Sequence, residues 1–247
     1  MPTLRFLIAY DGTRYGGWQR QRNAPTVQAK LETALRRLTG RRVVVTGAGR
    51  TDAGVHAWGQ VAHVTVATHL PPRILRQALN ALLPPDILVR RVTRAPSTFH
   101  AQFQAARKWY RYRIATGPVR PLFDRPYVHY VPQPLNLAAM QRAARRWRGR
   151  HDFRPFHSAG RTVADTRRTI HALRLTRRGR ELHVDVEADG FLYHMVRRMV
   201  GALLIVGQGK PAPAVAPTAP ARGLCLMRVT YRAPRARRRA DTTKYSA

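Results

Sequence analysis

The chain is predicted to repeat one order of elements in its two halves: strand, helix, strand, strand, helix, strand. Apolar periodicity and turn residues predict strands over residues 4–10, 43–46, 60–66, 87–93, 108–115, 168–176, 181–188 and 224–231. The same signals predict helices over residues 27–38, 72–82, 137–148 and 191–206. Two βαββαβ units are typical of an α+β fold with two ferredoxin-like halves, a continuous, mostly antiparallel sheet and helices packed on it. We expect the functional site in a cleft between the halves.

The domain boundaries follow from this element order alone, because no residue-level repeat relates the two halves. The first half is expected to span residues 1–104 and the second residues 105–232, followed by a basic tail over residues 233–247. Thr26 and Asn136 are expected to cap the helices that begin after them, and Gly40 to end the first helix. The Pro/Ala-rich stretch 207–223 is expected to form an extended loop.

The charge indicates a polyanionic partner. Against 45 Lys and Arg the chain has 12 Asp and Glu, a formal net charge of +33, and a field of this size attracts nucleic-acid backbones. The basic residues extend from Arg5 to Arg239 and do not follow one amphipathic helix, so binding to a membrane surface is disfavoured. No apolar run of membrane-spanning length and no signal-peptide core is present, which favours a cytoplasmic protein.

The cysteine and histidine content argues against disulfides and metal chemistry. Cys225 is the only cysteine, which excludes an intrachain disulfide and a cysteine-rich zinc site. The ten histidines are scattered and none belongs to a His-Glu-x-x-His arrangement. We therefore expect no metal ion.

Asp52 is the acid best placed for chemistry, in the glycine-framed loop GAGRTDAGVH over residues 47–56. Next to Arg50 it should keep its negative charge, which suits a nucleophile or a permanent anion. The other acids have simpler explanations: we expect Glu32 on the exposed side of a helix, those of strand 181–188 beside neighbouring arginines, and the rest in turns, caps, loops or the tail. The alternative for Asp52 is an Asx-turn, which loop aspartates commonly form.

Two further segments combine aromatic, apolar and basic residues. In the strand KWYRYR over residues 108–113, alternation puts Tyr110 and Tyr112 on one face, either for stacking on bases or as a core-facing pair. In residues 189–201, an apolar stripe formed by Phe191, Met195, Met199 and, beyond it, Leu203 is expected in the core. The adjacent Arg197 and Arg198 indicate a solvated face or phosphate contacts, or an arginine buried against Asp52.

Together these segments resemble the tRNA pseudouridine synthase A family. The resemblance rests on GRTDAGVH over residues 49–56, the strand over residues 108–112 and the stretch 191–201. It extends to the YDG and YGGWQRQ sequences near the N-terminus, to Phe99-His100-Ala101 and to Gly223-Leu224-Cys225-Leu226, so that matching stretches run from about residue 4 to residue 231. The chain departs from the family in the short Pro/Ala loop 207–222, where the family usually has a helical segment.

The resemblance implies isomerisation of uridine to pseudouridine at positions 38, 39 and 40 of the tRNA anticodon arm. It implies that Asp52 is the nucleophile, that Tyr110 stacks on the uracil and helps remove its C5 proton, and that Arg197 pairs with Asp52. Arg50 would help open the base stack. Among the other residues of these motifs, Thr51, His56 and Leu226 are expected to contact substrate. The reaction needs no cofactor, and family members work as homodimers.

Two other function classes fit the composition less well. A non-catalytic RNA-binding module would also use ferredoxin-like halves and a basic surface, but the chain has no aromatic-rich RNP1 strand. It also gives no reason for the loop around Asp52. A nuclease is disfavoured because the chain has no clustered carboxylates to hold metal ions.

Overall fold

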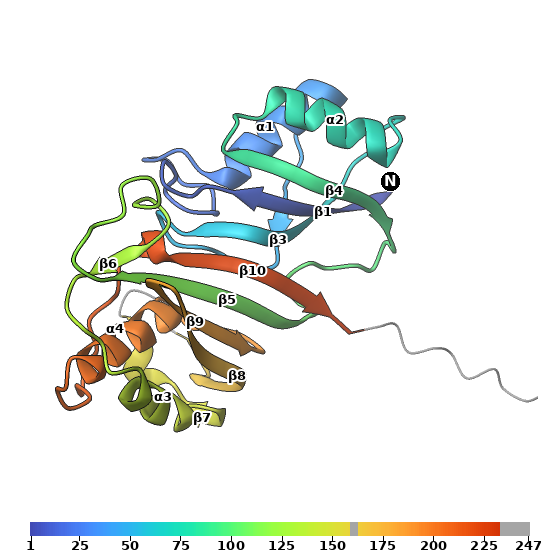
Figure 1. Cartoon of the computed structure of the whole chain (residues 1–247). Helices are drawn as coiled ribbons and strands as arrows, with labels where there is room; N and C mark the ends of the chain where they lie inside the picture. The colour runs from blue at the N-terminus through green and yellow to red at the C-terminus, as the bar shows by residue number, and fades with distance from the viewer. Residues whose placement is uncertain (159–162, 233–247) are drawn as a thin grey trace, which may run out of the picture.

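One mixed sheet organises the residues that the computed structural model describes, 1–158 and 163–232. Its strands are β1 (Thr3–Tyr10), β2 (Thr46–Gly47), β3 (His56–Thr65), β4 (Ile87–Ala95), β5 (Ala105–Thr116), β6 (His129–Val131), β7 (Gly149–Asp152), β8 (Arg167–Arg178), β9 (Glu181–Ala188) and β10 (Leu224–Tyr231). The helices are α1 (Val27–Thr39), α2 (Pro72–Leu82), α3 (Leu137–Arg145) and α4 (Met195–Gly207). The strand order is β4-β1-β3-β10-β5-β9-β8-β7, with β2 on β3 and β6 on β5 (Figure 1). The prediction of an α+β fold with a mostly antiparallel sheet is confirmed. The basic tail over residues 233–247 lies outside the described residues.

The junction between β3 and β10 is short and places the Asp52 loop. These two strands pair in parallel only at His56 with Cys225 and at Ala57 with Leu226. The Asp52 loop runs directly into β3, while β10 pairs along most of its length with β5. The loop from the first half therefore reaches the sheet of the second half where β5 carries Tyr110.

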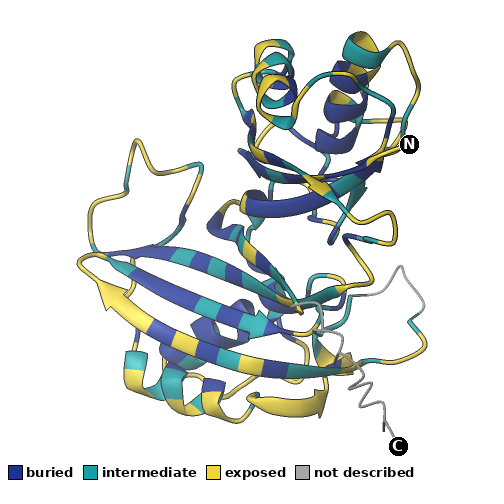
Figure 2. Ribbon diagram, turned by 90° about the vertical axis from the view of Figure 1, so that its right-hand side faces the viewer, coloured by how far each residue is buried: buried dark blue, intermediate teal, exposed yellow. Residues whose placement is uncertain are grey.

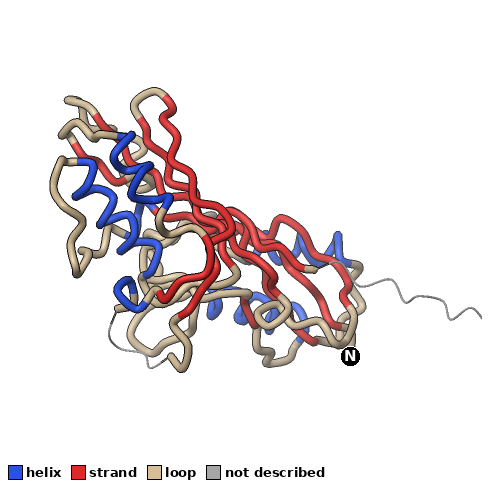
Figure 3. The backbone as a smooth tube through the Cα atoms, turned by 90° about the horizontal axis from the view of Figure 1, so that it is seen from below, coloured by secondary structure: helices blue, strands red, loops and turns tan. Residues whose placement is uncertain are grey.

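The helices form two groups, and one hydrophobic core extends beneath both. Figure 3 shows α1 and α2 apart from α3 and α4, with the strands running between the two groups. The buried residues alternate with exposed ones along the strands, as the banding in Figure 2 shows. On β5, Tyr110, Tyr112 and Ile114 are buried as the alternation predicts, while Arg111 and Arg113 on the other face are only partly covered. No helix of the described residues has the length and apolar character needed to cross a bilayer.

The expected helix caps are confirmed. The Thr26 hydroxyl accepts a hydrogen bond from the Ala29 backbone N–H, and the Asn136 side chain accepts one from Ala139. Gly40 ends α1 with φ of 69°, a left-handed conformation that glycine adopts without steric cost.

The largest correction concerns Glu32, which is buried rather than exposed. Its Oε1 accepts hydrogen bonds from the Val45 backbone N–H at 3.0 Å and from Gln28 Nε2 at 3.0 Å, and the other oxygen pairs with Arg20. A buried carboxylate needs such partners to offset its lost hydration. The same contacts explain why the strand predicted over residues 43–46 is confirmed only at Thr46, in β2. Gln28 also donates to the Val45 carbonyl, so side chains take the backbone groups of Val45 and keep it out of the sheet.

Two helix boundaries differ from the prediction by three residues or more. The third helix ends at Arg145 instead of residue 148, because the chain turns there to form β7, which pairs with β8. The fourth begins at Met195 instead of residue 191, because His194 has φ of 62° and interrupts helical geometry. His194 is the only described residue other than glycine with positive φ. The short strands β6 and β7 were not predicted.

A stability prediction follows from the packing of α4. A Cβ atom on Gly201 would overlap the backbone carbonyl oxygen of Pro217, which cannot move aside as a side chain does. Alanine favours a helix over glycine by about 1 kcal/mol, but overpacking costs up to about 3 kcal/mol, so we expect Gly201→Ala to lose roughly 2 kcal/mol of unfolding free energy. Thermal denaturation should show a Tm lower by about 4–8 °C.

Gly207→Ala is the matched control for this prediction, because it makes the same substitution in the same helix. The added methyl group there meets the flexible Met140 side chain, with Sδ at 2.8 Å, and a smaller loss is expected. Equal stability of the Gly201→Ala variant and the wild type would show that the close approach of α4 to Pro217 is not maintained in solution.

Candidate functional site

A cavity of about 990 Å³ opens between the two halves. Its walls come from the Asp52 loop, from β5 through Lys108 and Tyr110, and from the turn and first residues of α4 over 191–197. The cleft expected between the halves is therefore present. It is lined by the three residues that are expected to carry out the reaction, Asp52, Tyr110 and Arg197.

The Asp52 loop is held by the segment 15–18 of the first half. Trp18 donates its backbone N–H to the Thr51 carbonyl at 3.1 Å, and the Gly54 N–H donates to the Tyr15 carbonyl at 3.2 Å. Gly17 has φ of 98°, and any side chain there would run into the Thr51 carbonyl. The loop thus depends on close backbone approach, and its carboxylate is fixed by structure outside the loop.

Asp52 pairs with Arg197, 145 residues further along the chain. Nη1 of Arg197 donates to Oδ2 of Asp52 at 3.1 Å, and the two side chains are 15% and 25% exposed respectively. Nε of the same guanidinium donates to the Ala219 carbonyl at 2.8 Å, which fixes its plane. In the described residues, no backbone N–H donates to the Asp52 carboxylate, so the Asx-turn alternative is not supported.

Arg197 and Arg198 have different surroundings although they are neighbours on α4. Arg198 donates to the carbonyls of His157 at 2.6 Å and Ala216 at 3.1 Å. It therefore ties α4 to two loops, and only Arg197 reaches the carboxylate. The pair was expected to form a solvated face, to contact phosphate, or to bury one arginine against Asp52. The structure shows the last of these, with Arg197.

His194 is a member of the site that the sequence analysis missed. Its Nε2 lies 3.5 Å from Oδ2 of Asp52, and its Nδ1 lies 3.0 Å from the Ser158 hydroxyl. Burial lowers the pKa of His194, with the nearby Arg197 and Arg198 acting in the same direction and Asp52 opposing them, so the imidazole is neutral at pH 7. No local signal identified it, because the segment was expected to be helical throughout.

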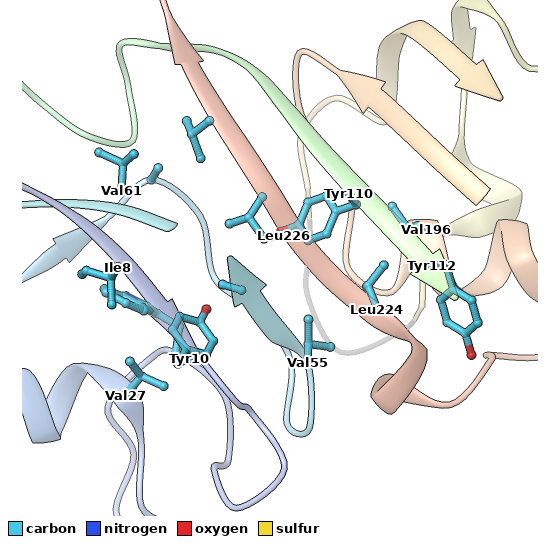
Figure 4. Close-up of a cluster of buried hydrophobic side chains, with 14 of the residues drawn as sticks. Ile8, Tyr10, Val27, Val55, Val61, Tyr110, Tyr112, Val196, Leu224 and Leu226 are labelled. Atoms are coloured by element: carbon cyan, nitrogen blue, oxygen red, sulfur yellow. The ribbon is translucent and has the colours of Figure 1, made fainter. Parts of the chain in front are cut away.

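Tyr110 borders the cavity with its ring packed edge-on against Phe191, at a centroid distance of 5.2 Å. Burial, reinforced by Tyr10 and Asp52, raises the pKa of Tyr110, so the phenol is un-ionised at neutral pH. Within the described part of the chain, no hydrogen bond engages its hydroxyl group. Tyr112 on the same face is completely buried and donates to the Pro220 carbonyl at 2.8 Å, so it is the core residue of the two (Figure 4).

Besides Tyr110, the four residues expected to contact substrate divide into two pairs. Arg50 and Thr51 line the cavity, where Arg50 is held by Gln19 at 3.1 Å and the Thr51 hydroxyl lies 2.8 Å from that of Tyr10. His56 and Leu226 do not line it.

The contacts of His56 and Leu226 are structural. Nδ1 of His56 accepts the Gly12 N–H at 3.1 Å, and Nε2 lies 3.0 Å from the Pro126 carbonyl. Leu226 is fully buried opposite Tyr110 on β10 (Figure 4). Both residues stabilise the elements that form the cavity wall but do not line the cavity themselves.

The charge around the cavity is strongly unbalanced. Among its described lining residues Asp52 is the only acid, whereas five are basic: Arg20, Arg50, Lys108, Arg168 and Arg197. The acids of β9 pair elsewhere, as expected, Glu181 with Arg113 and Asp185 with Arg111. No group of three or more His, Cys, Asp and Glu in the described residues is arranged to hold a metal ion. The site therefore offers a fixed, accessible carboxylate in cationic surroundings.

Two comparisons with known proteins point to one family. The family model for tRNA pseudouridine synthase matches residues 7–104 and 143–232. The tRNA pseudouridine synthase A of Moorella thermoacetica is 44% identical over 246 residues, covering 94% of this chain and 100% of that protein. The enzyme of the same name from Brevibacillus brevis is 43% identical over 244 residues, again covering 94% of this chain and 100% of that protein.

A solved structure of an H/ACA RNP bound to a substrate RNA containing 2'-deoxyuridine aligns with a TM-score of 0.40 and 10% identity, over 92% of this chain and 47% of that chain. A likeness this weak supports no inference about function.

Proposed function

The chain belongs to the tRNA pseudouridine synthase family, and we propose that it isomerises uridine at positions 38, 39 and 40 of the tRNA anticodon arm. The reaction breaks the N1–C1′ glycosidic bond, turns the uracil, and joins C5 to C1′. The observation that carries this proposal is the Asp52 carboxylate, held by Arg197 beside Tyr110 in a cation-lined cavity.

Asp52 acts as the nucleophile, at the ribose C1′ or at the base, or as the base of a route through a glycal. Each of these steps needs an ionised carboxylate held close to the nucleotide. Arg197 supplies both requirements, because its charge favours the anion and its second hydrogen bond to Ala219 fixes the direction of the first.

Tyr110 provides a ring for the target uracil and a hydroxyl group at the reacting base. Because burial raises the pKa of this phenol, it acts in proton transfer as a neutral group and not as a preformed phenolate. Its hydroxyl oxygen accepts the C5 proton while its own O–H proton passes to water in the open cavity.

Entry of the uridine requires unstacking, which costs a few kcal/mol. Arg50 stands at the cavity next to Asp52, where a guanidinium can replace the lost stacking. Phosphate contacts across the basic surface offset the rest of the cost.

The same family likeness leads us to propose that residues 1–104 and 105–232 are two ferredoxin-like units. The strand orders β4-β1-β3-β2 and β10-β5-β9-β8 support this, since they correspond strand for strand. A homodimer and a cytoplasmic location are proposed from the family alone.

Release of tritium tests the proposed function directly. Transcribed tRNA labelled at uracil C5 should lose tritium to water when incubated with the protein, because the C5 hydrogen leaves when C5 becomes bonded to C1′. Labelled tRNA in which positions 38–40 hold no uridine is the control. Binding without tritium release from any tRNA would mean that the protein is an RNA-binding protein and not an isomerase.

Removing the Tyr110 hydroxyl separates its two proposed roles. Tyr110→Phe keeps the ring against Phe191, so binding should be unchanged, whereas loss of a proton-transfer group should lower kcat by roughly 10²-fold. Single-turnover tritium release measures this effect.

Tyr112→Phe is the matched control, since it removes a hydroxyl from the same face of β5 but away from the cavity. It should cost about 1 kcal/mol of stability and leave kcat unchanged. A full rate for Tyr110→Phe would rule out the proton-transfer role.

A further inference from the structure

We propose that Lys108 and Arg168 form a binding site for one backbone phosphate of the RNA, adjacent to the nucleotide that enters the cavity. This inference rests on the proposed function and adds to it a defined anion subsite. Neither residue was assigned a role by the sequence motifs.

Lys108 reaches the site because of its register on β5. It stands two residues before Tyr110, so both side chains point to the same face of the strand, and both line the cavity. Its Nζ lies 3.2 Å from the position that a Cβ on Gly49 would occupy, with Cε at 3.4 Å. The ammonium group thus packs against the loop that carries Asp52, because Gly49 precedes Asp52 by three residues.

The Lys108 ammonium has no partner among the described residues: neither a hydrogen bond nor an ion pair reaches it. Burial lowers the pKa of Lys108, and the charge of Arg168 lowers it further. Of the other basic residues of the cavity, Arg197 pairs with Asp52 and Arg20 with the buried Glu32, while Arg50 is held by Gln19. A partly desolvated cation without a counter-charge therefore borders the reaction site.

Arg168 supplies the second charge from β8, on the other side of β9 from β5. Its Nη1 donates to the carbonyls of Asp165 at 2.9 Å and Arg167 at 2.6 Å, and its Nε lies 3.3 Å from the Cβ position of Gly190. These contacts anchor the guanidinium, while Nη2 has no partner among the described residues.

Two cations without a counter-charge at one wall of a cavity repel each other, and a bound anion removes that cost. The anion that an RNA presents beside every nucleotide is its phosphate. Phosphate accepts hydrogen bonds from a guanidinium and from an ammonium together, and such contacts set the register of a nucleic acid without reading its sequence. Placed here, the phosphate fixes the ribose of the entering nucleotide relative to Asp52.

The experiment combines Lys108→Met with neutral linkages in the RNA. An anticodon stem-loop is prepared with a single methylphosphonate at each linkage around the target uridine, and its Kd is measured for each variant. For the wild-type protein, one linkage should weaken binding about tenfold or more, as expected for one charge-assisted hydrogen bond. With Lys108→Met, the all-phosphate RNA should bind about tenfold more weakly, and that linkage should cause no further loss.

Three further variants sharpen the result. Lys108→Arg should restore the penalty at that linkage, and Arg168→Met should remove it as Lys108→Met does. Lys30→Met removes the same kind of side chain from the exposed face of α1, outside the cavity, and should leave the linkage profile as in the wild type. Tm values measured in parallel identify any variant that fails to fold. If Lys108→Met fails to fold, the linkage penalty of Lys108→Arg is compared with that of Arg168→Met instead.

A linkage profile for Lys108→Met equal to that of the wild type would overturn the subsite. A loss in kcat for Lys108→Met, with an unchanged linkage profile, would also overturn it, because Lys108 would then act in the reaction and not in phosphate binding. The linkage profile is a binding measurement, so it does not depend on whether the wild-type protein releases tritium. Failure of the subsite is therefore distinguishable from failure of the proposed function.

Discussion

Replacing Asp52 with asparagine is expected to abolish pseudouridine formation while tRNA binding is retained. The amide has nearly the size of the carboxylate but is neither a nucleophile nor a base, so we expect turnover to fall by roughly 10⁴-fold or more. Binding should not weaken, because Asp52 is the only acid among the described lining residues of a basic cavity, and removing its charge does not reduce attraction for RNA.

Tritium release and filter binding on the same preparation measure the two effects. Asp124→Asn is the matched control, since Asp124 is 57% exposed, lies outside the cavity and should tolerate the substitution in both assays. Asp52→Ala should match Asp52→Asn and has no amide that can hydrolyse back to the acid. Turnover by Asp52→Ala near the wild-type rate would remove Asp52 from the mechanism.

The parts of the fold that were predictable from the sequence are those fixed by neighbouring residues. Thr26 and Gly40 delimit α1, Pro72 begins α2, and a turn at Gly179 joins β8 to β9, each through backbone preferences that act within a few positions. These signals gave the order of the main elements, which in turn indicated a mostly antiparallel sheet.

The errors occur where distant side chains override local preference. Val45 has strand propensity, but Glu32 and Gln28 take its backbone groups, and Glu32 is itself buried by that arrangement. Residues 191–194 continue a helical apolar pattern, yet His194 adopts a left-handed conformation where its ring meets Ser158 and approaches Asp52. Neither outcome is encoded within a short window of sequence.

The sequence predicted the acidic residue of the site, Asp52, but not all of the basic residues that surround it. Asp52 could be selected because the chain has 12 acids, and most of the others have structural explanations. The 45 basic residues allowed no such selection, so that Lys108 and Arg168 were not distinguished from the rest. The pairing of Asp52 with Arg197 was one alternative that the residue pattern left open, and the family resemblance favoured it.

Arg197→Lys is expected to lower kcat by roughly 10³-fold, the cost of losing a preorganised electrostatic contact, with little change in tRNA binding. Arg197 makes two divergent hydrogen bonds from one rigid plane, Nε to Ala219 and Nη1 to Asp52. A lysine ammonium on a flexible stem cannot hold both directions at once. It preserves the positive charge, however, so any loss reflects the orientation of the carboxylate rather than its ionisation.

Arg198→Lys separates this effect from general damage to α4. Arg198 is the next residue on the helix, and it donates only to the carbonyls of His157 and Ala216. Its replacement should lower Tm by several degrees, as expected for about 1–2 kcal/mol of lost hydrogen bonding, and leave kcat close to that of the wild type. If both variants lost kcat equally, the cause would be the packing of α4 against the loops, and the contact between Arg197 and Asp52 would have no separate role in turnover. If only Arg197→Lys loses kcat, the orientation of Asp52 by the guanidinium is what the rate depends on.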